Sequence, residues 1–302
     1  KDINPDVVHA HNIHYYLSYH CLKLAKKYAK AVFLTAHDVM LFNYEKLATK
    51  RYLEKFDCKT NWLDHLKQAR KRYNPFRNII NRHYLKYVDK VFAVSNVLKE
   101  VLKANGIRNT EVIYNGIDVD DWQVNFELVG QFKKKYSLQD KKIILLAGRI
   151  GKLKGIEQIE TAMVRVKREV PEAILLIVGS AGLGWLSGDE LKAAYHSAEI
   201  VVTPSICFDT FNRTNIEAMA CKKPVVGTCY GGTPEIVQDG VTGYIVNPFN
   251  TELMAQRIID LLKNPQQAEH FGEAGYQRVI NNFSSQNQTR KTLTHYQKYI
   301  YG

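Results

Sequence analysis

The sequence predicts an α/β protein built on two parallel β-sheets, and three observations carry this prediction. Short apolar runs alternate with stretches of helical spacing along the chain. Most of these runs are continuously apolar, which is typical of parallel strands covered by helices on both faces. A length of 302 residues usually corresponds to two domains, and 45% hydrophobic residues can support two cores.

The first series of strands and helices extends to about residue 114. Gly106 follows one of its helices at the position where a helix end favours a positive φ. The chain then passes through a polar span at 122–140, which we interpret as the boundary between domains. The strands expected before this span are 7–9, 31–35, 90–94 and 111–114, and the helices are 16–29 and 96–105.

A second series follows the polar span and ends in a helical tail at 266–301 that no strand follows. Its apolar runs are bounded by glycine, proline and polar residues, as expected of buried strands. The expected strands are 143–147, 173–178, 200–203, 224–227 and 244–246, and the expected helices are 156–169, 188–198, 214–221 and 251–263.

The net charge of +12 is concentrated in one segment. Residues 46–90 hold 13 basic and four acidic side chains, which points to an anionic partner. Large apolar residues are interspersed, so an amphipathic surface resting on an anionic membrane is one interpretation. A solvated helical hairpin is a second. Nucleic acid is a third, because aromatic residues stand beside basic ones in Arg72-Tyr73 and Lys86-Tyr87.

Membrane-spanning and disulfide-bonded classes are disfavoured. No apolar run approaches the roughly 18 residues of a transmembrane helix. The five cysteines are odd in number and form no Cys-x-x-Cys pair, so reduced thiols are expected.

The stretch from Ser205 to Ala220 carries the strongest functional signal. It follows an expected strand and places two carboxylates, Asp209 and Glu217, on either side of a loop-to-helix junction. The first N–H groups of a helix lack partners and lie at the positive end of its dipole, so they bind anions. This arrangement suits a nucleotide sugar, with its diphosphate on the N–H groups and its hydroxyls on the acids.

The same stretch resembles the signature of retaining glycosyltransferases of family 4, which have the GT-B fold. The family pattern is Glu, seven residues and Glu, with Phe-Gly between them; this chain has Asp209, Phe211-Asn212 and Glu217-Ala-Met-Ala220. Other segments resemble further elements of the family, in the same order. They are Val8-His-Ala-His-Asn12, Thr35-Ala-His-Asp38, Val94-Ser-Asn96, Ile113-Tyr-Asn-Gly-Ile-Asp118, Gly148-Arg-Ile-Gly-Lys-Leu-Lys-Gly155 and the glycine-rich segment from Tyr230 to Tyr244.

The resemblance implies two Rossmann-like domains that face each other across a cleft. The expected division is an acceptor-side domain at 1–125, a nucleotide-sugar-binding domain at 126–285, and a helix at 286–302 that crosses back to the first domain. The first domain opens at what resembles its fourth strand, so it is expected to be incomplete. The family pattern also has a helix and a strand between residues 181 and 183 that this sequence lacks. We favour omission of these residues from the sequence over their loss from the protein, because losing a strand from the middle of a sheet would be costly.

The resemblance also assigns roles to donor-site residues. A fixed Arg–Lys pair can neutralise a diphosphate without a metal. Asp209 replaces the family's first Glu and is one methylene shorter, so its reach to the transferred sugar changes. Asn212 replaces a Gly but tolerates the left-handed conformation, and Arg213 contacts phosphate or points to solvent. The implied diphosphate-binding residues are Arg149, Lys154, Phe211, Asn212 and Arg213, and those for sugar and nucleotide are Asp209, Glu217, Gly231 and Gly232.

On the acceptor side, His37 resembles the family's active-site histidine near the transferred sugar. His11, Asn12 and Asp38 are expected beside the acceptor, although structural roles explain them equally well. His9, His11 and His14 form a His-x-His-x-x-His pattern, but no cysteine or acid with ligand spacing joins them, so no metal is expected. The catalytic residues implied are His37, Asp209 and Glu217. Neither His37 nor Asp38 is assigned as a general base.

We therefore expect a retaining hexosyltransferase that uses a nucleotide-diphosphate sugar, a glycan or lipid-linked acceptor, and neither cofactor nor metal. It would act in surface polysaccharide or glycolipid synthesis, in the cytoplasm at the inner face of the cell membrane, without binding nucleic acid. Three alternatives remain: a non-catalytic partner with the same fold, a sugar-nucleotide epimerase, and a nucleic-acid-binding module. The glycines of Gly179-Ser-Ala-Gly-Leu-Gly184 have the wrong order for a dinucleotide loop.

Overall fold

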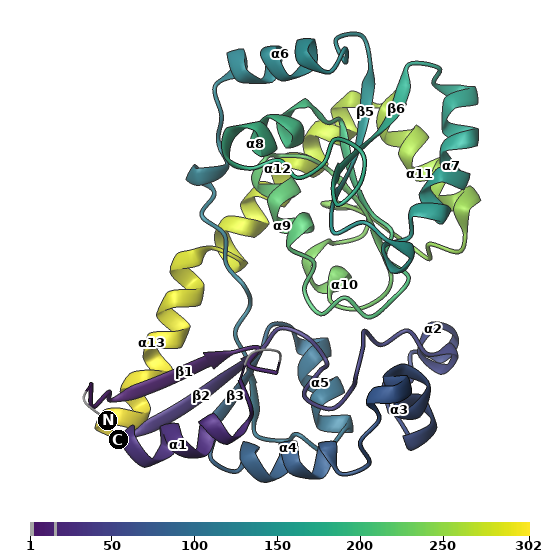
Figure 1. Ribbon diagram of the computed structural model, residues 1–302. Helices are drawn as coiled ribbons and strands as arrows, with labels where there is room; N and C mark the ends of the chain where they lie inside the picture. The colour runs from purple at the N-terminus through teal and green to yellow at the C-terminus, as the bar shows by residue number, and fades with distance from the viewer. Residues whose placement is uncertain (1–2, 15–16) are drawn as a thin grey trace. The chain divides into compact units, whose positions relative to one another are not determined.

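The computed structural model describes residues 3–14 and 17–302, and these residues divide into two units, each with its own parallel sheet (Figure 1). The first unit runs to Asn115 and also includes Phe208–Phe211 and Gln286–Gly302. The second comprises Gly116–Cys207 and Asn212–Ser285. The predicted class, two α/β units with parallel sheets, is confirmed.

The first unit contains a four-stranded parallel sheet in the order β1-β2-β3-β4. The expected helix at 16–29 is shorter in the structure, and its residue Tyr16 lies outside the described residues. The strands are β1 (Val7–His11), β2 (Ala31–Ala36), β3 (Lys90–Ala93) and β4 (Thr110–Val112). The helices are α1 (His20–Tyr28), α2 (Lys50–Lys55), α3 (Trp62–Ala69), α4 (Arg77–Leu85), α5 (Asn96–Ala104) and α13 (Ser285–Tyr301), with a 3₁₀ turn η1 (Arg70–Arg72).

Helix α13 packs on this sheet although it is the last element of the chain. Phe33 of β2 and Phe92 of β3 are fully buried, and the ring of Tyr296 from α13 stacks on Phe33 with centroids 5.2 Å apart. Tyr299 meets the same Phe33 ring edge-on at 5.3 Å. Aromatic pairs in these geometries add about 0.5–1.5 kcal/mol each to the burial of their area, so they fasten α13 to the first unit.

The second unit contains a five-stranded parallel sheet in the order β6-β5-β7-β8-β9. Its strands are β5 (Lys142–Gly148), β6 (Ala173–Gly179), β7 (Ile200–Thr203), β8 (Val225–Thr228) and β9 (Gly243–Val246). Its helices are α6 (Phe126–Lys135), α7 (Ile156–Glu169), α8 (Gly188–Ser197), α9 (Arg213–Ala220), α10 (Thr233–Ile236), α11 (Thr251–Lys263) and α12 (Pro265–Asn282), with 3₁₀ turns η2 (Asp120–Trp122) and η3 (Lys152–Lys154).

Three expectations from the sequence differ from the structure. The span at 122–140 contains helix α6, which Asn125 caps through the Glu127 N–H and whose Phe132 is buried. The tail at 266–301 is two helices, α12 and α13, separated at Phe283. Strand β6 is an edge strand, so a segment missing after it would not open a gap in mid-sheet.

The structure also bears on disulfide bonds and on membrane-spanning helices. All five cysteines are free thiols. Within the described ranges, no helix is both long and apolar enough to cross a bilayer.

Candidate functional site

Four of the predicted residues lie together in the first unit, where β1 and β2 end. These strands pair in parallel register, with His11 opposite Thr35, so the residues that follow both strands emerge at one edge of the sheet. His11 and His37 face each other there, with His11 Nδ1 2.9 Å from His37 Nε2 and the rings stacked at 5.2 Å. The structure therefore brings His11, Asn12, His37 and Asp38 into one cluster.

Asn12 connects the two strand ends. It has a left-handed φ of 41°, which asparagine adopts more readily than most residues. Its Oδ1 accepts a hydrogen bond from the His37 N–H at 3.2 Å, and its Nδ2 donates to Asp38 Oδ2 at 3.2 Å. Asp38 Oδ1 accepts from the Met40 N–H at 2.8 Å. These bonds fix the orientation of Asp38 before any ligand is present.

The three histidines of the His-x-His-x-x-His pattern have different partners. His9 lies 2.7 Å from Thr35 Oγ1 and 2.6 Å from Tyr296 OH, and His14 Nε2 lies 3.2 Å from Asp38 Oδ2. Burial, aided by His11 and His37, lowers the pKa of His9 to about 4, and burial lowers the pKa of His11. Among residues 3–14 and 17–302, no cluster of His, Cys, Asp and Glu is arranged to hold a metal ion.

The segment Phe208–Phe211 is held to the first unit by hydrogen bonds. The Phe208 N–H donates to Leu47 O at 2.7 Å, and Ser95 Oγ donates to Thr210 O at 2.7 Å. Thr210 Oγ1 donates to the carbonyl oxygen of His37 at 2.5 Å. Asp209 therefore belongs to the unit that carries His37, whereas the sequence placed it in a domain at 126–285.

In the second unit, the loop after β5 carries Arg149 and Lys154. It ends at Gly155, which has a φ of +74° and lies so close to Pro204 that a Cβ would be 1.9 Å from the Pro204 carbonyl oxygen. Pro204 directly follows β7, so this contact holds the loop at the carboxyl edge of the sheet. Helix α7 begins at Ile156 without a side-chain cap, which leaves its first N–H groups available to an anion.

Helix α9 begins after β7 and carries two of the predicted residues at its start. Asn212 is the N-cap and accepts a hydrogen bond from the Thr214 N–H at 3.2 Å. Its φ of −76° and ψ of 100° are extended, so the left-handed conformation considered for it is not adopted. Arg213 is exposed and no acidic residue occupies the first turn, so this helix end is positive.

Glu217 lies one turn further along α9 and is held by a residue that sequence reasoning missed. Tyr195 OH of α8 donates to Glu217 Oε2 at 2.7 Å, and Arg213 Nε lies 3.8 Å from Oε1. Burial raises the pKa of Glu217, against the opposing effects of Tyr195 and Arg213. The Glu217 side chain keeps 18% of its surface exposed. Tyr195 reads in sequence as one more apolar residue of a buried helix face, so no local signal reveals this bond.

The glycines after β8 precede a very short helix. Gly231 has a φ of +66°, and Gly232 is the N-cap of the four-residue α10. Thr233 lies inside this helix and is fully buried. Its hydroxyl accepts a hydrogen bond from Asn215 Nδ2 at 3.3 Å, while Asn215 Oδ1 accepts from Thr203 Oγ1 at 2.8 Å. This network fastens α9 to β7 and α10.

The second unit thus brings cationic side chains, helix N-termini and a carboxylate to one edge of its sheet. Arg149, Lys154 and Arg213 supply positive charge, and the helix starts at Ile156 and Arg213 supply N–H groups. All of them follow the carboxyl ends of strands, where ligands bind in open α/β sheets. Glu217 adds a hydrogen-bond acceptor that Tyr195 orients.

Two family profiles match this chain. The profile described as "Glycosyl transferases group 1" matches residues 130–278, and "Glycosyltransferase Family 4" matches residues 1–121. An uncharacterized glycosyltransferase of Methanocaldococcus jannaschii is 32% identical over 235 residues, which are 68% of this chain and 59% of that protein. The chain therefore spans less than two thirds of the length of this relative.

Solved structures agree with the sequence profiles. A glycosyltransferase from Rickettsia africae ESF-5 superposes with a TM-score of 0.75 at 25% identity, over 99% of this chain and 78% of that one. Anabaena HepE, solved in complex with UDP-glucose, superposes with a TM-score of 0.73 over 96% of this chain and 79% of that one; at 16% identity it shows the fold alone. On the combined match of both profiles and the shared fold, the chain belongs to the GT-B glycosyltransferases of family 4.

Proposed function

We propose that this protein transfers a hexosyl group, with retention of configuration, from a nucleotide-diphosphate sugar to a glycan or lipid-linked acceptor. The observation that carries the proposal is the convergence in the second unit of three cationic side chains, two helix N-termini and the hydrogen-bonded Glu217–Tyr195 pair. The HepE structure supports it, since that protein has the same fold and was solved with UDP-glucose.

The donor's diphosphate is the leaving group in this proposal. When the bond between the sugar and the diphosphate breaks, its electron pair passes to the phosphate oxygen, and negative charge grows there. Arg149 and Lys154 would stabilise that charge, with Arg213 and the N–H groups of α7 and α9. Glu217 would bind ribose hydroxyls of the nucleotide, and Asp209 would contact the transferred sugar. No metal enters the proposed reaction.

Configuration is retained in this proposal because the acceptor would attack from the face that the leaving group vacates. In the proposed reaction the departing phosphate oxygen takes the acceptor's proton, so no side chain serves as a general base. The first unit's cluster would position the sugar and the acceptor through hydrogen bonds. Because burial lowers the pKa of His9 and His11, these imidazoles are neutral at pH 7 and offer polar contacts rather than charge.

The proposed acceptor places the reaction in the synthesis of surface polysaccharide or glycolipid. We propose that the protein works at the cytoplasmic face of the cell membrane, bound to its surface. Support comes from the 13 basic and four acidic side chains of residues 46–90 and from the exposed apolar side chains among them.

Donor binding is tested by a thermal-shift screen of UDP-, GDP- and ADP-sugars, with and without EDTA. One nucleotide class should stabilise the protein, by about 2.7 kcal/mol at 100 times its Kd, and EDTA should leave the shift unchanged. Arg149→Ala should weaken the shift. Absence of any shift would contradict the donor site, and loss of the shift in EDTA that Mn²⁺ or Mg²⁺ restores would contradict metal independence.

Asp209 is the test of sugar selection. The change Asp209→Glu lengthens the acid by one methylene, so it should alter relative transfer rates among donors that share one nucleotide. Nucleotide affinity should change little, because Asp209 lies outside the second unit's set of phosphate-binding residues. Rates are measured by product formation with several sugars. Identical ratios in the parent and the variant would show that Asp209 does not contact the sugar.

The non-catalytic partner remains the second candidate, because Asp209 and Asn212 depart from the family signature. The Asn212 departure gives this candidate little support, since Asn212 makes a regular N-cap for α9. The Asp209 departure still supports it. A donor thermal shift without transfer to any acceptor would favour it. Release of free nucleotide without acceptor would favour the epimerase instead.

A further inference from the structure

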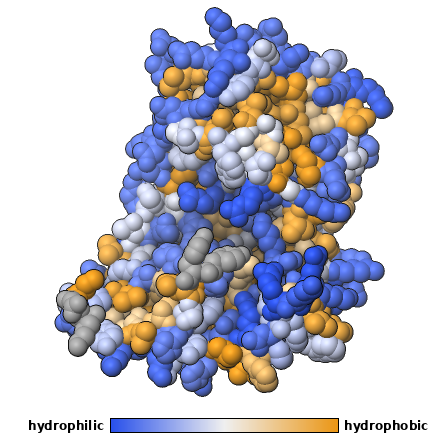
Figure 2. Space-filling model, viewed as in Figure 1, coloured by the Kyte–Doolittle hydropathy of each residue, from blue (hydrophilic) through white to orange (hydrophobic). Residues whose placement is uncertain are grey.

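The helices between β2 and β3 expose an unusual number of large apolar side chains. On α3 these side chains are Trp62, Leu63 and Leu66, and at the start of α4 they are Phe76, Ile79 and Ile80. Residues three or four positions apart lie on the same side of a helix, so each helix has an outward apolar stripe. Figure 2 shows such hydrophobic atoms lying among strongly hydrophilic ones. The exposed residues are Phe56, Trp62, Leu63, Leu66, Phe76, Ile79 and Ile80, between 42 and 64% exposed.

A polar cavity of about 310 Å³ lies between α3, α4 and the end of α5. Lys59 and Thr60 line it from the linker between α2 and α3, His65 from α3, and Arg82 from α4. None of its lining residues is acidic. Burial lowers the pKa of His65, so the positive charge of the cavity comes from Lys59 and Arg82.

Those two cations have no counter-charge among the residues that the structure describes. Neither the Lys59 ammonium nor the Arg82 guanidinium takes part in a hydrogen bond or ion pair there. The nearby carboxylates are already engaged, since Arg51 lies 3.7 Å from Asp57 and 3.4 Å from Asp64. The cavity is therefore an uncompensated positive site.

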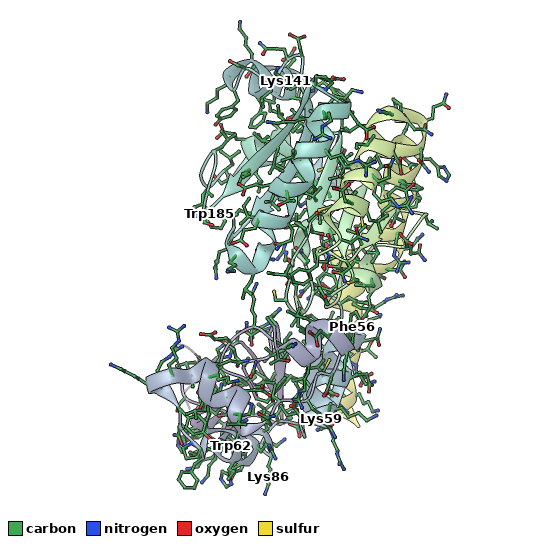
Figure 3. All side chains as sticks on the ribbon, turned by 90° about the vertical axis from the view of Figure 1, so that its right-hand side faces the viewer. Phe56, Lys59, Trp62, Lys86, Lys141 and Trp185 are labelled. Carbon is green, nitrogen blue, oxygen red and sulfur yellow. The ribbon has the colours of Figure 1, made fainter. Side chains whose placement is uncertain are left out.

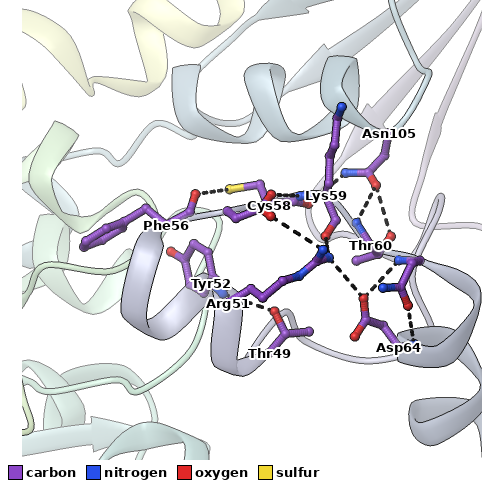
Figure 4. A network of polar contacts seen from close by, with 11 residues as sticks. Thr49, Arg51, Tyr52, Phe56, Cys58, Lys59, Thr60, Asp64 and Asn105 are labelled. Carbon is purple, nitrogen blue, oxygen red and sulfur yellow. Dashed lines mark hydrogen bonds and ion pairs between the residues drawn. The ribbon is translucent and has the colours of Figure 1, made fainter.

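The linker that presents Lys59 is held in place (Figure 4). Arg51 Nη2 donates to Lys59 O at 2.5 Å, and Asn105 Nδ2 donates to Cys58 O at 3.0 Å. Thr60 Oγ1 donates to Asn105 Oδ1 at 3.0 Å, and Asn61 with Asp64 forms a capping box at the start of α3. The backbone that presents Lys59 therefore loses little conformational entropy when a ligand binds.

We propose that this surface docks on an anionic phospholipid bilayer and that the Lys59–Arg82 cavity binds the phosphate of one lipid headgroup. Charge complementarity and the adjoining apolar stripes together select this occupant: a free phosphate would leave the stripes unexplained, and a nucleic acid would not require them. Figure 3 shows Phe56, Lys59 and Trp62 on the side of the first unit that carries α2 and α3. The inference deepens the membrane location in the proposed function and rests on it.

Vesicle co-sedimentation tests the proposal. The full chain should bind phosphatidylcholine vesicles that contain phosphatidylglycerol, and bind poorly to phosphatidylcholine alone. Each Lys or Arg near an anionic surface contributes about a fivefold change in partition, from roughly 1 kcal/mol. Two such cations correspond to about 30-fold, and the double variant Lys59→Ala/Arg82→Ala should lower the partition coefficient by more than this, because it also removes two direct contacts to the headgroup phosphate. Trp62→Ser with Ile79→Ser should also lower it, through lost apolar insertion.

Two matched controls separate the cavity from general charge. Lys67→Ala/Lys71→Ala removes two exposed cations near α3 outside the cavity, and Lys167→Ala/Arg168→Ala removes two from α7 in the second unit. The α7 control should bind like the parent, and the α3 control should lose less than the cavity variant. Equal losses in both variants of the first unit would overturn the headgroup site. Equal binding to neutral and anionic vesicles would overturn the docking surface.

Further measurements identify the source of the phosphate and guard against a folding defect in the variant. If inorganic phosphate raises Tm through Lys59 and Arg82 while anionic vesicles fail to bind, the ligand is a free phosphate and the lipid assignment is wrong. Tighter binding to a single-stranded oligonucleotide than to the vesicles would contradict it too. Should the alanine variant lower Tm, Lys59→Gln/Arg82→Gln replaces it. The nucleotide-sugar shift should persist in both, so failure here is distinguishable from failure of the donor site.

Discussion

Replacing Arg149 or Lys154 with alanine is expected to lower the rate of glycosyl transfer by about 30-fold or more in each case. Charge develops on the diphosphate as the sugar leaves, and losing one fixed cation at such an anion costs roughly 2 kcal/mol or more. The loop places both residues at the carboxyl edge of the second sheet, with Gly155 against Pro204. The measurement is kcat/KM with the donor found in the thermal-shift screen.

Lys152→Ala is the matched control for this prediction. Lys152 is a lysine of the same 3₁₀ turn as Lys154 and has no predicted role in the site. It should keep most of the activity, and all three variants should keep the parent Tm, because Arg149 and Lys152 are exposed and Lys154 is only partly buried. Parent-like turnover in the Arg149→Ala/Lys154→Ala double variant would refute the proposed donor site.

Replacing Gly155 with alanine is expected to destabilise the second unit by about 3 kcal/mol. A φ of +74° costs a residue with a Cβ about 1–2 kcal/mol, and a Cβ 1.9 Å from Pro204 O forces the backbone apart at a further cost of about 1–3 kcal/mol. For a unit of this size the expected fall in Tm is roughly 6–12 °C. Urea or thermal unfolding followed by circular dichroism measures it.

Gly151→Ala in the same loop is the control. Gly151 has an extended φ of −177°, and a Cβ there would meet no atom within 4 Å. Its stability should therefore stay close to that of the parent. The Gly155 variant should also lose affinity for the nucleotide sugar, because the displaced loop carries Arg149 and Lys154. Unchanged stability of Gly155→Ala would show that the loop is not packed against β7.

The sequence determined the fold class, and together with the family resemblance it named most members of the two residue clusters. Continuous apolar runs such as 143–147 and 200–203 are strands in the structure because burial on both faces leaves a strong local pattern. The residues at strand ends follow from the same pattern, since parallel strands deliver their carboxyl ends to one edge. The family resemblance had already grouped His11, Asn12, His37 and Asp38 on the acceptor side, and hydrogen bonds join them in the structure.

Only the tertiary structure decided which unit each residue joins and what holds it. Phe208–Phe211 belongs to the first unit because of hydrogen bonds to Leu47, Ser95 and His37, more than 100 residues away. The sequence did not predict helix α6 because Phe132 is its one buried residue, and its neighbours are glycine, lysine and other residues without an apolar periodicity. Periodicity reports burial within one element. A hydrogen bond such as Tyr195 to Glu217 joins two elements, and it leaves no trace in the local spacing of either.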